Sequence, residues 1–189
     1  AQKAAALAIG EAAAQTLRLA DDVLHIARIQ ARKLSLTPAD IDIAVLLSEC
    51  CSEAAEAGCG ISQEIAPDLG LVHADAEAMR WLLRTLIDNA RRAEPAGGQV
   101  RMTARVAAGK IEIAVHDDGA AIGEADIDIL MRPFDSTAAE AASARVKGAG
   151  LGMALASALA GEVGGILSIT RPPEGGTRVV LHLPCAPSA

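Results

Sequence analysis

The first 34 residues place small or apolar side chains at alternating intervals of four and three. These positions are Ala6, Gly10, Ala13, Leu17, Ala20, Leu24, Ala27, Ala31 and Leu34. The spacing is typical of the seam of a coiled coil or helical bundle. One such helix cannot bury its stripe alone, so we expect a partner helix; the alternative is an amphipathic helix packed on its own domain. Pro38 disfavours helical geometry at Thr37 and ends the segment, so the first predicted domain spans residues 1–38.

Beyond residue 38, short apolar runs between turn residues predict a succession of strands and helices. Strands are expected at 41–43, 61–65, 71–74, 100–106, 110–116, 166–170 and 177–183, and helices at 44–57, 76–92, 124–130 and 153–163. We expect Asp75 to cap the second helix, and Val45, Leu46 and Leu47 to face inward from the first. Residues 39–189 are thus predicted to form a two-layer α/β sandwich, a mixed sheet with helices on one face, preceded by the long coiled-coil-like helix.

Composition narrows the class of partner. Hydrophobic residues make up 51% of the chain, but Trp81 and Phe134 are the only aromatic residues, so the core must consist of Leu, Ile, Val and Ala. The net charge of −7 argues against nucleic acid as a partner, because phosphate backbones are bound by cationic surfaces. Four cysteines without Cys-x-x-Cys spacing are expected to be reduced thiols rather than a metal site or disulfide framework.

The chain shows no targeting or membrane signal. No apolar run approaches the roughly 20 residues of a membrane span, and no signal peptide is visible. We therefore expect a cytoplasmic location and no membrane contact by this chain. Because the sequence begins Ala-Gln-Lys without Met, we expect it to be part of a longer protein, whose membrane attachment stays open.

A glycine-rich run precedes the last predicted helix: Gly148-Ala149-Gly150-Leu151-Gly152. Glycine allows positive φ and a close approach of the backbone to a ligand, and a helix N-terminus offers free N–H groups to a phosphate. No Gly-Lys-Ser/Thr follows and no strand leads in, which argues against a P-loop and a dinucleotide fingerprint. The Ala-rich residues 136–146 are predicted to form a flexible loop, and together the features suggest a lid over a nucleotide.

Two polar residues add to this signal. Asn89 lies on a helix that is apolar at Leu82, Leu83, Leu86, Ile87 and Ala90. Its amide oxygen is the kind of ligand that Mg²⁺ between phosphates accepts. Asp117 follows the predicted strand 110–116 and can accept a hydrogen bond from the amino group of adenine, while Gly119 lets the backbone pass close to the base. Taken alone, Asn89 can also be an exposed residue near a helix end, and Asp117-Asp118-Gly119 an ordinary turn.

Asn on a helix, Asp-x-Gly after a strand and Gly-x-Gly-Leu-Gly before a helix follow the order of the ATP site in histidine kinases. The chain resembles the catalytic domain of a two-component sensor histidine kinase, with the Bergerat-type fold shared with gyrase, Hsp90 and the mismatch-repair ATPases. The resemblance implies ATP and Mg²⁺ as cofactors, with Asn89 as the Mg²⁺ ligand and Asp117 with Gly119 at the adenine. It places Gly148, Gly150, Leu151 and Gly152 at the phosphates. Arg92 matches a position that is usually Lys and can offset phosphate charge; a surface arginine is an almost equally good interpretation.

The resemblance also implies partners. The first helix matches the second helix of a dimerisation hairpin, so a homodimer through this helix is expected. His25 lacks the acidic residue and Arg-Thr-Pro that follow the family's phosphoacceptor, which would therefore lie on an upstream helix. From there the phosphoryl group would pass to a response regulator. Phe134 is expected to pack and anchor the lid.

Four positions depart from the family pattern. Thr85 stands where histidine kinases usually carry another Asn, Ala93 and Glu94 replace an aromatic residue and a Thr, and Ala121 replaces the second glycine of Asp-x-Gly-x-Gly. Gyrase-like ATPases carry a general-base Glu at the position of Thr85, so we expect slow ATP hydrolysis. The departures motivate an alternative, a pseudokinase or scaffold that signals by protein contact with weak or no ATP binding. A third reading, an anti-sigma-factor-type serine kinase, is opposed by the preceding heptad helix.

Overall fold

The computed structural model describes residues 10, 27, 35–94, 98–120, 122–123, 127 and 150–185. The chain divides into two compact units, Ala1–Ser35 and Leu36–Ala189. In the first unit only Gly10, Ala27 and Ser35 are described; all three are exposed, and Gly10 and Ala27 are helical. The rest of the predicted seam, the lid at 136–146 and most of the predicted helix 124–130 lie outside the described residues. Within the described part, no helix is both long and apolar enough to cross a membrane.

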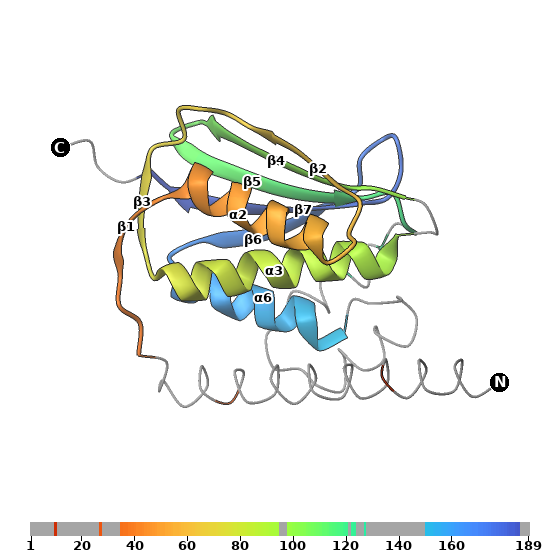
Figure 1. The fold of residues 1–189 in the computed structure, drawn as a ribbon, viewed down its shortest axis with the longest axis horizontal. Coiled ribbons are helices and arrows are strands. Elements are labelled where there is room, and N and C mark those ends of the chain that lie inside the picture. Colours follow the sequence, from red (N-terminus) through yellow and green to blue (C-terminus); the bar gives the residue numbers. More distant parts are fainter. Residues whose placement is uncertain are drawn as a thin grey trace. The chain divides into compact units, whose positions relative to one another are not determined.

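A five-stranded mixed sheet forms the centre of the second unit, in the order β2-β4-β5-β7-β6 (Figure 1). The strands are β2 (Ile61–Ile65), β4 (Val100–Ala107), β5 (Lys110–Asp117), β6 (Ile166–Thr170) and β7 (Thr177–Pro184). β2 runs parallel to β4, and the other neighbouring pairs are antiparallel. Both predicted hairpins, β4–β5 and β6–β7, are confirmed, and so is the mixed sheet.

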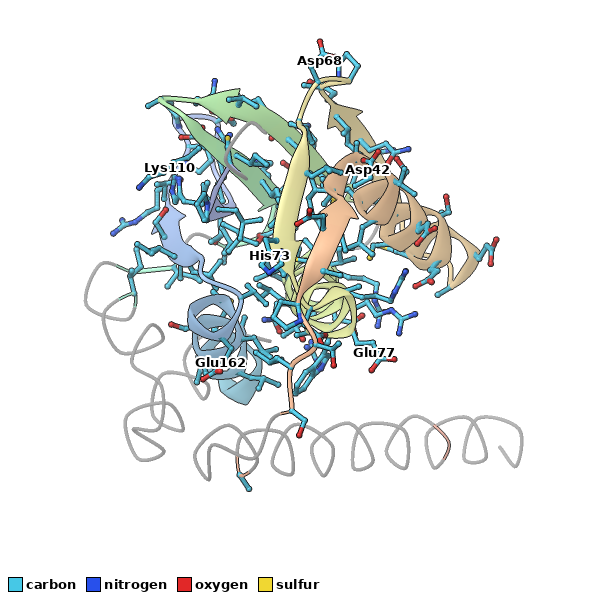
Figure 2. All side chains as sticks on the ribbon, turned by 90° about the vertical axis from the view of Figure 1, so that its left-hand side faces the viewer. Asp42, Asp68, His73, Glu77, Lys110 and Glu162 are labelled. Atoms are coloured by element: carbon cyan, nitrogen blue, oxygen red, sulfur yellow. The ribbon has the colours of Figure 1, made fainter. Side chains whose placement is uncertain are left out.

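Two further strands form a separate antiparallel ribbon, β1 (Ala39–Asp42) and β3 (Leu71–Ala74). His73 on β3 lies 2.8 Å from the Asp40 carboxylate on β1, measured from the ring Nδ1 to Oδ1. Figure 2 looks onto this ribbon, with His73 near its centre. Because β1 leads directly into α2 and β3 into α3, the ribbon joins the starts of these two helices.

Three helices lie on one face of the sheet: α2 (Ile43–Glu56), α3 (Ala76–Ala93) and α6 (Gly150–Glu162) (Figure 1). Each contributes a fully buried leucine, Leu47, Leu82 and Leu155 respectively. On the sheet, Ile113 and Leu181 are aligned in register and have no exposed surface. The core is therefore the aliphatic layer between sheet and helices, as the near-absence of aromatic residues requires. This confirms the predicted two-layer α/β sandwich.

The start of α2 differs from the prediction. The Asp42 side chain accepts hydrogen bonds from the backbone N–H groups of Ala44 and Val45 and caps the helix, so Ile43 is its first residue rather than the end of a strand. The buried positions of α2 are Ile43, Leu46, Leu47, Cys50 and Cys51. These residues recur at intervals of three and four and form one helical stripe. Val45 lies off this stripe and is 54% exposed, so its predicted inward orientation was wrong.

α3 and α6 pack side by side and run in opposite directions. In Figure 1 the sequence colours run from left to right along α3 and from right to left along α6. Asp75 caps α3 as predicted: its carboxylate accepts from Ala78 N–H at 2.8 Å and from Thr37 N–H at 2.7 Å. The antiparallel packing places the C-terminal end of α3 beside the N-terminal end of α6.

Candidate nucleotide-binding site

Asn89, in the last turns of α3, is buried with an incompletely satisfied side chain. It is 8% exposed, and its Oδ1 accepts a hydrogen bond from Arg92 Nη2 at 2.8 Å. Its Nδ2 is buried and has no hydrogen-bond partner among the described residues. An unpaired buried amide costs about 1–3 kcal/mol, so its retention points to a ligand. The structure thus brings together two of the predicted site residues, Asn89 and Arg92.

Gly152 lies directly against Asn89. A Cβ atom at Gly152 would come within 2.6 Å of Asn89 Oδ1 and 3.0 Å of Nδ2, so only glycine allows this contact between α3 and α6. The described part of α6 starts at Gly150, so Gly150, Leu151 and Gly152 already lie in this helix, which was expected to begin only at Met153. Gly152 therefore serves close approach rather than positive φ. Gly148 lies outside the described residues.

Asp117 ends β5 as a buried carboxylate, 5% exposed. Burial raises its pKa from 3.8 to about 6, and the nearby Glu94 carboxylate acts in the same direction. The backbone N–H of Gly119, which donates to Asp117 Oδ1 at 3.0 Å, opposes this shift. At neutral pH the group is ionised, desolvated and a strong acceptor for a ligand N–H.

Two glycines allow the chain to close around the end of β5. A Cβ at Gly119 would lie 2.3 Å from the carbonyl oxygen of Ala93, the last residue of α3. A Cβ at Gly176 would lie 1.8 Å from the carbonyl oxygen of Asp117, and Gly176 has φ +73°. Any larger residue at either position would push the end of α3 or the β6–β7 turn away from Asp117. Gly119 was predicted from the sequence, whereas Gly176 was not.

Thr177 and Glu94 were not predicted as site residues. Thr177 pairs in register with Asp117, is 2% exposed, and its Oγ1 has no hydrogen-bond partner in the described part of the chain. Glu94 Oε1 accepts from the Asp118 N–H at 2.7 Å, while its Oε2 is buried and unpartnered among those residues. The sequence signal for Thr177 is its place directly after Gly175-Gly176, at the start of a strand. Glu94 had no sequence signal of its own beyond replacing the Thr of the histidine kinase pattern.

The unpartnered buried polar atoms gather at this end of the fold. Among the described residues there are four: Asn89 Nδ2, Glu94 Oε2, His116 Nδ1 and Thr177 Oγ1. His116 adjoins Asp117 on β5, and its Nε2 lies 3.2 Å from Asp118 Oδ1. Buried polar groups in proteins are nearly always hydrogen-bonded. Their concentration around Asp117 and the end of α3 therefore indicates a site for a polar ligand.

The remaining departures have distinct outcomes. The Thr85 hydroxyl donates to the Trp81 carbonyl oxygen at 2.9 Å, within α3, so it is used inside the helix. Ala93 contributes its backbone carbonyl to the contact with Gly119 rather than a side chain to the base. Ala121 and Phe134 lie outside the described residues.

The model of the family described as "Histidine kinase-, DNA gyrase B-, and HSP90-like ATPase" matches residues 74–187, which include Asn89, Asp117 and Gly152. The chain belongs to this family. The resemblance to the ATP-binding domain of histidine kinases, predicted from the sequence, is therefore confirmed. The fold is that of the family's catalytic ATPase domain.

Several relatives of this chain bear the names of sensor proteins or histidine kinases. Sensor protein DivL of Caulobacter vibrioides is 32% identical over 94% of this chain and 23% of its own length. Histidine protein kinase DivJ of the same organism is 32% identical over 93% of this chain and 30% of its own length. Sensor histidine kinase component HK1 of Mycobacterium tuberculosis is 31% identical, covering 75% of this chain and 81% of that protein. The chain thus spans less than a third of DivL and DivJ.

Solved structures show the same fold. Full-length ShkA in complex with AMPPNP superposes with a TM-score of 0.74 at 27% identity, covering 95% of this chain and 38% of ShkA. The catalytic domain of histidine kinase ThkA superposes with a TM-score of 0.65 at 20% identity, covering 81% of this chain and all of that domain. The second likeness concerns the fold alone.

Proposed function

We propose that this chain is the ATP-binding catalytic part of a two-component sensor histidine kinase. It binds Mg·ATP and delivers the γ-phosphoryl group to a histidine on an upstream helix, from which the group passes to a response regulator. The observation that carries the proposal is the contact of Asn89 with Gly152, at the same end of α3 as the buried Asp117. The first relatives are much longer than this chain, so dimerisation through residues 1–34 and the regulator belong to the proposal.

Asp117 would bind the adenine. Its ionised carboxylate accepts a hydrogen bond from the exocyclic amino group, and the fixed Gly119 N–H keeps the acceptor oriented. Thr177 lies on the neighbouring strand in register with Asp117, and its Oγ1, which has no hydrogen-bond partner among the described residues, would bond a ring nitrogen or a bridging water. Guanine presents a carbonyl oxygen where adenine presents the amino group, so the same carboxylate disfavours GTP.

Asn89 is the residue that would hold Mg²⁺. In the described part of the chain no three His, Cys, Asp or Glu side chains are arranged to hold a metal ion. A single amide oxygen suits Mg²⁺ that keeps its water and phosphate ligands. The bound ion would neutralise charge that develops on the phosphates. Gly152 lies against the Asn89 amide, and its lack of a side chain would let the phosphates approach the backbone of α6.

The transfer step requires positioning more than covalent chemistry. The bond between the γ-phosphorus and the β–γ bridging oxygen breaks, a bond to an imidazole nitrogen forms, and ADP leaves with the electron pair. Thr85 carries a neutral hydroxyl, which donates a hydrogen bond to the Trp81 carbonyl oxygen. It therefore cannot activate water as the carboxylate of a general-base Glu would. Hydrolysis of ATP is therefore expected to be slow compared with transfer to histidine.

Phosphotransfer tests the proposal directly. A protein that contains this chain and the upstream phosphoacceptor helix is incubated with γ-labelled ATP and Mg²⁺. The expected product carries a phosphate that is lost in acid and kept in base, as a phosphohistidine does, and Asn89→Ala removes the metal-dependent part of nucleotide binding together with the label. ATP binding without any labelled histidine would contradict the kinase assignment.

A degenerate pseudokinase or scaffold is the second candidate. Arg92 already occupies the Asn89 oxygen, and Glu94 places a second carboxylate near Asp117. Both features work against a standard ATP site. Absence of nucleotide binding would favour this candidate and direct attention to protein partners.

A further inference from the structure

We propose that Arg92 acts as a built-in cation at the metal-binding oxygen of Asn89, so that nucleotide binding in this protein depends only weakly on Mg²⁺. The inference rests on the proposed function and concerns the same site. This role differs from a general neutralisation of phosphate charge, because the guanidinium occupies the Asn89 oxygen that would otherwise bind the metal.

The geometry places the guanidinium at the oxygen in question. Arg92 Nη2 donates to Asn89 Oδ1 at 2.8 Å, and the two residues are one helical turn apart on α3. Gly152 closes the other side of the Asn89 amide, since a Cβ there would lie 2.6 Å from the same oxygen. The Asn89 oxygen is thus held between α6 and a positive charge.

Arg92 is free to bind something else at the same time. Among the residues that the structure describes, it has no carboxylate partner, and its side chain reaches the surface. The neighbouring Arg91 differs: its Nε lies 3.7 Å from Asp88 Oδ1, an ion pair on the same helix. The two adjacent arginines therefore offer a matched comparison, one directed to the Asn89 amide and the other to a carboxylate.

The chemistry of the guanidinium suits a bridging role. It carries five N–H donors in a planar fork, of which one is used by Asn89. The others can bind two phosphate oxygens in a bidentate arrangement. A bound Mg²⁺, held by the Asn89 amide oxygen, would supply positive charge to the phosphates at the same place. A lysine is a point charge without a fixed fork, so it cannot hold both partners in one geometry.

Arg92 and Mg²⁺ compete in this arrangement. Two cations close to one oxygen repel each other strongly in a partly buried site, so Mg²⁺ can take the Asn89 oxygen only when Arg92 leaves it. The affinity that Mg²⁺ adds is offset by the contact that it displaces. The metal therefore adds little to nucleotide affinity while Arg92 is present, and much more when it is absent.

The test measures the Kd of AMPPNP by calorimetry in excess Mg²⁺ and in EDTA, for the wild-type chain and for Arg92→Gln, Arg92→Lys and Arg91→Gln. We expect EDTA to weaken binding less than about threefold in the wild type and in Arg91→Gln, but roughly tenfold or more in Arg92→Gln. Arg92→Lys is expected to lie between them. Thermal unfolding of each variant checks that the fold is retained.

Two results would overturn the inference. One is an equal fold-loss on EDTA in the wild type and Arg92→Gln; the substitution then weakens binding equally with and without metal, as expected of an ordinary phosphate ligand. The other is a loss of roughly tenfold or more on EDTA in the wild type itself. A wild-type chain that binds no AMPPNP under either condition would instead contradict the proposed function, so the two failures are distinguishable.

Discussion

The ionised Asp117 carboxylate is expected to favour ATP binding but to lower the stability of the folded state. Its carboxylate is desolvated at the end of β5, and its pKa of about 6 means that the folded state holds its proton more tightly than the unfolded chain, where the ordinary value is 3.8. A raised pKa contributes stability that is fully present below about pH 4 and is lost as the pH rises through about 6. Above that pH the ionised group destabilises the fold, and it does so in the form that accepts the adenine amino group.

Asp117→Asn is therefore expected to be more stable and less able to bind. At pH 8 the free energy of unfolding should rise by about 1–3 kcal/mol, because the buried charge is gone while the amide oxygen still accepts from Gly119 N–H. At pH 4 the two proteins should have similar stability. ATP affinity at pH 8 should fall by roughly tenfold or more, since a charge-assisted hydrogen bond is lost. Denaturant unfolding at the two pH values and calorimetry measure both effects.

A lower stability of Asp117→Asn at pH 8 would show that the carboxylate is held by stabilising hydrogen bonds rather than desolvated. ATP affinity unchanged by the substitution would remove Asp117 from the adenine site, whatever the stability result.

The site residues that the sequence revealed are those with a local signature. Asn89 is a polar residue on an apolar helix stripe, Asp117 follows a strand and precedes a glycine, and Gly152 lies in a glycine-rich run. Thr177 and Gly176 have no such signature, because their place beside Asp117 follows from the pairing of β5 with β7. Register between strands distant in sequence cannot be read from either strand alone.

Among the elements, α6 shows most clearly how position decides the role of a glycine. Gly152 faces the Asn89 amide at a distance that excludes a methyl group, whereas a Cβ at Gly161 would meet no atom within 4 Å. The helix is the same, and alanine is favoured over glycine in a helix interior by roughly 0.5–1 kcal/mol.

Gly152→Ala should weaken ATP binding by about tenfold or more, because the added methyl displaces the Asn89 amide that the metal or Arg92 uses. Gly161→Ala should bind ATP normally and raise the free energy of unfolding by up to about 1 kcal/mol. Calorimetry and denaturant unfolding of the pair measure both. Equal ATP affinities in the two variants would show that the α3–α6 contact does not shape the site.

α2 provides a second comparison, in which the sequence pattern was read incorrectly. Val45, Leu46 and Leu47 were expected to face inward together, but three consecutive helical residues span about 200° and cannot all share one face. Once Asp42 caps the helix, the stripe runs through Ile43, Leu46 and Leu47, and Val45 is left outside. Element type was predictable here, whereas the buried face depended on the position of the cap.

Truncation at the two α2 positions should therefore differ sharply. Leu47→Ala removes a fully buried side chain and should lower the free energy of unfolding by about 2–5 kcal/mol. Val45→Ala, at a position 54% exposed, should change it by less than about 0.5 kcal/mol. Denaturant unfolding of both variants is the measurement. A large effect at Val45 would show that a partner or another segment covers it.

The second unit is built on a sheet, and the sequence predicted only some of the strand pairings in it. The β4–β5 and β6–β7 hairpins follow from their short turns. The parallel pairing of β2 with β4 and the pairing of β5 with β7 join segments far apart in the chain. These long-range pairings bring the end of β5, the start of β7 and the end of α3 to one place. The resemblance to the kinase family, rather than periodicity, made this arrangement foreseeable.

The same arrangement leaves the described part of the fold with its unpartnered buried polar atoms at one end. A ligand that forms hydrogen bonds with these atoms would stabilise the folded state. Binding to the folded state alone stabilises it by about 2.7 kcal/mol at a ligand concentration a hundredfold above Kd. Nucleotide should therefore raise the unfolding temperature, by an amount that grows with the logarithm of the ratio of nucleotide concentration to Kd.

The central claim is that this end of the fold is an ATP site. Calorimetric titration of the chain with ATP in the presence of Mg²⁺ tests it most directly, with GTP as the matched control. We predict that ATP binds with a Kd in the micromolar to submillimolar range, which is a binding free energy on the order of −5 to −8 kcal/mol. GTP should bind roughly tenfold more weakly or not detectably, because the Asp117 carboxylate would face the guanine carbonyl oxygen. No detectable heat at millimolar ATP, or equal affinity for the two nucleotides, would contradict the account.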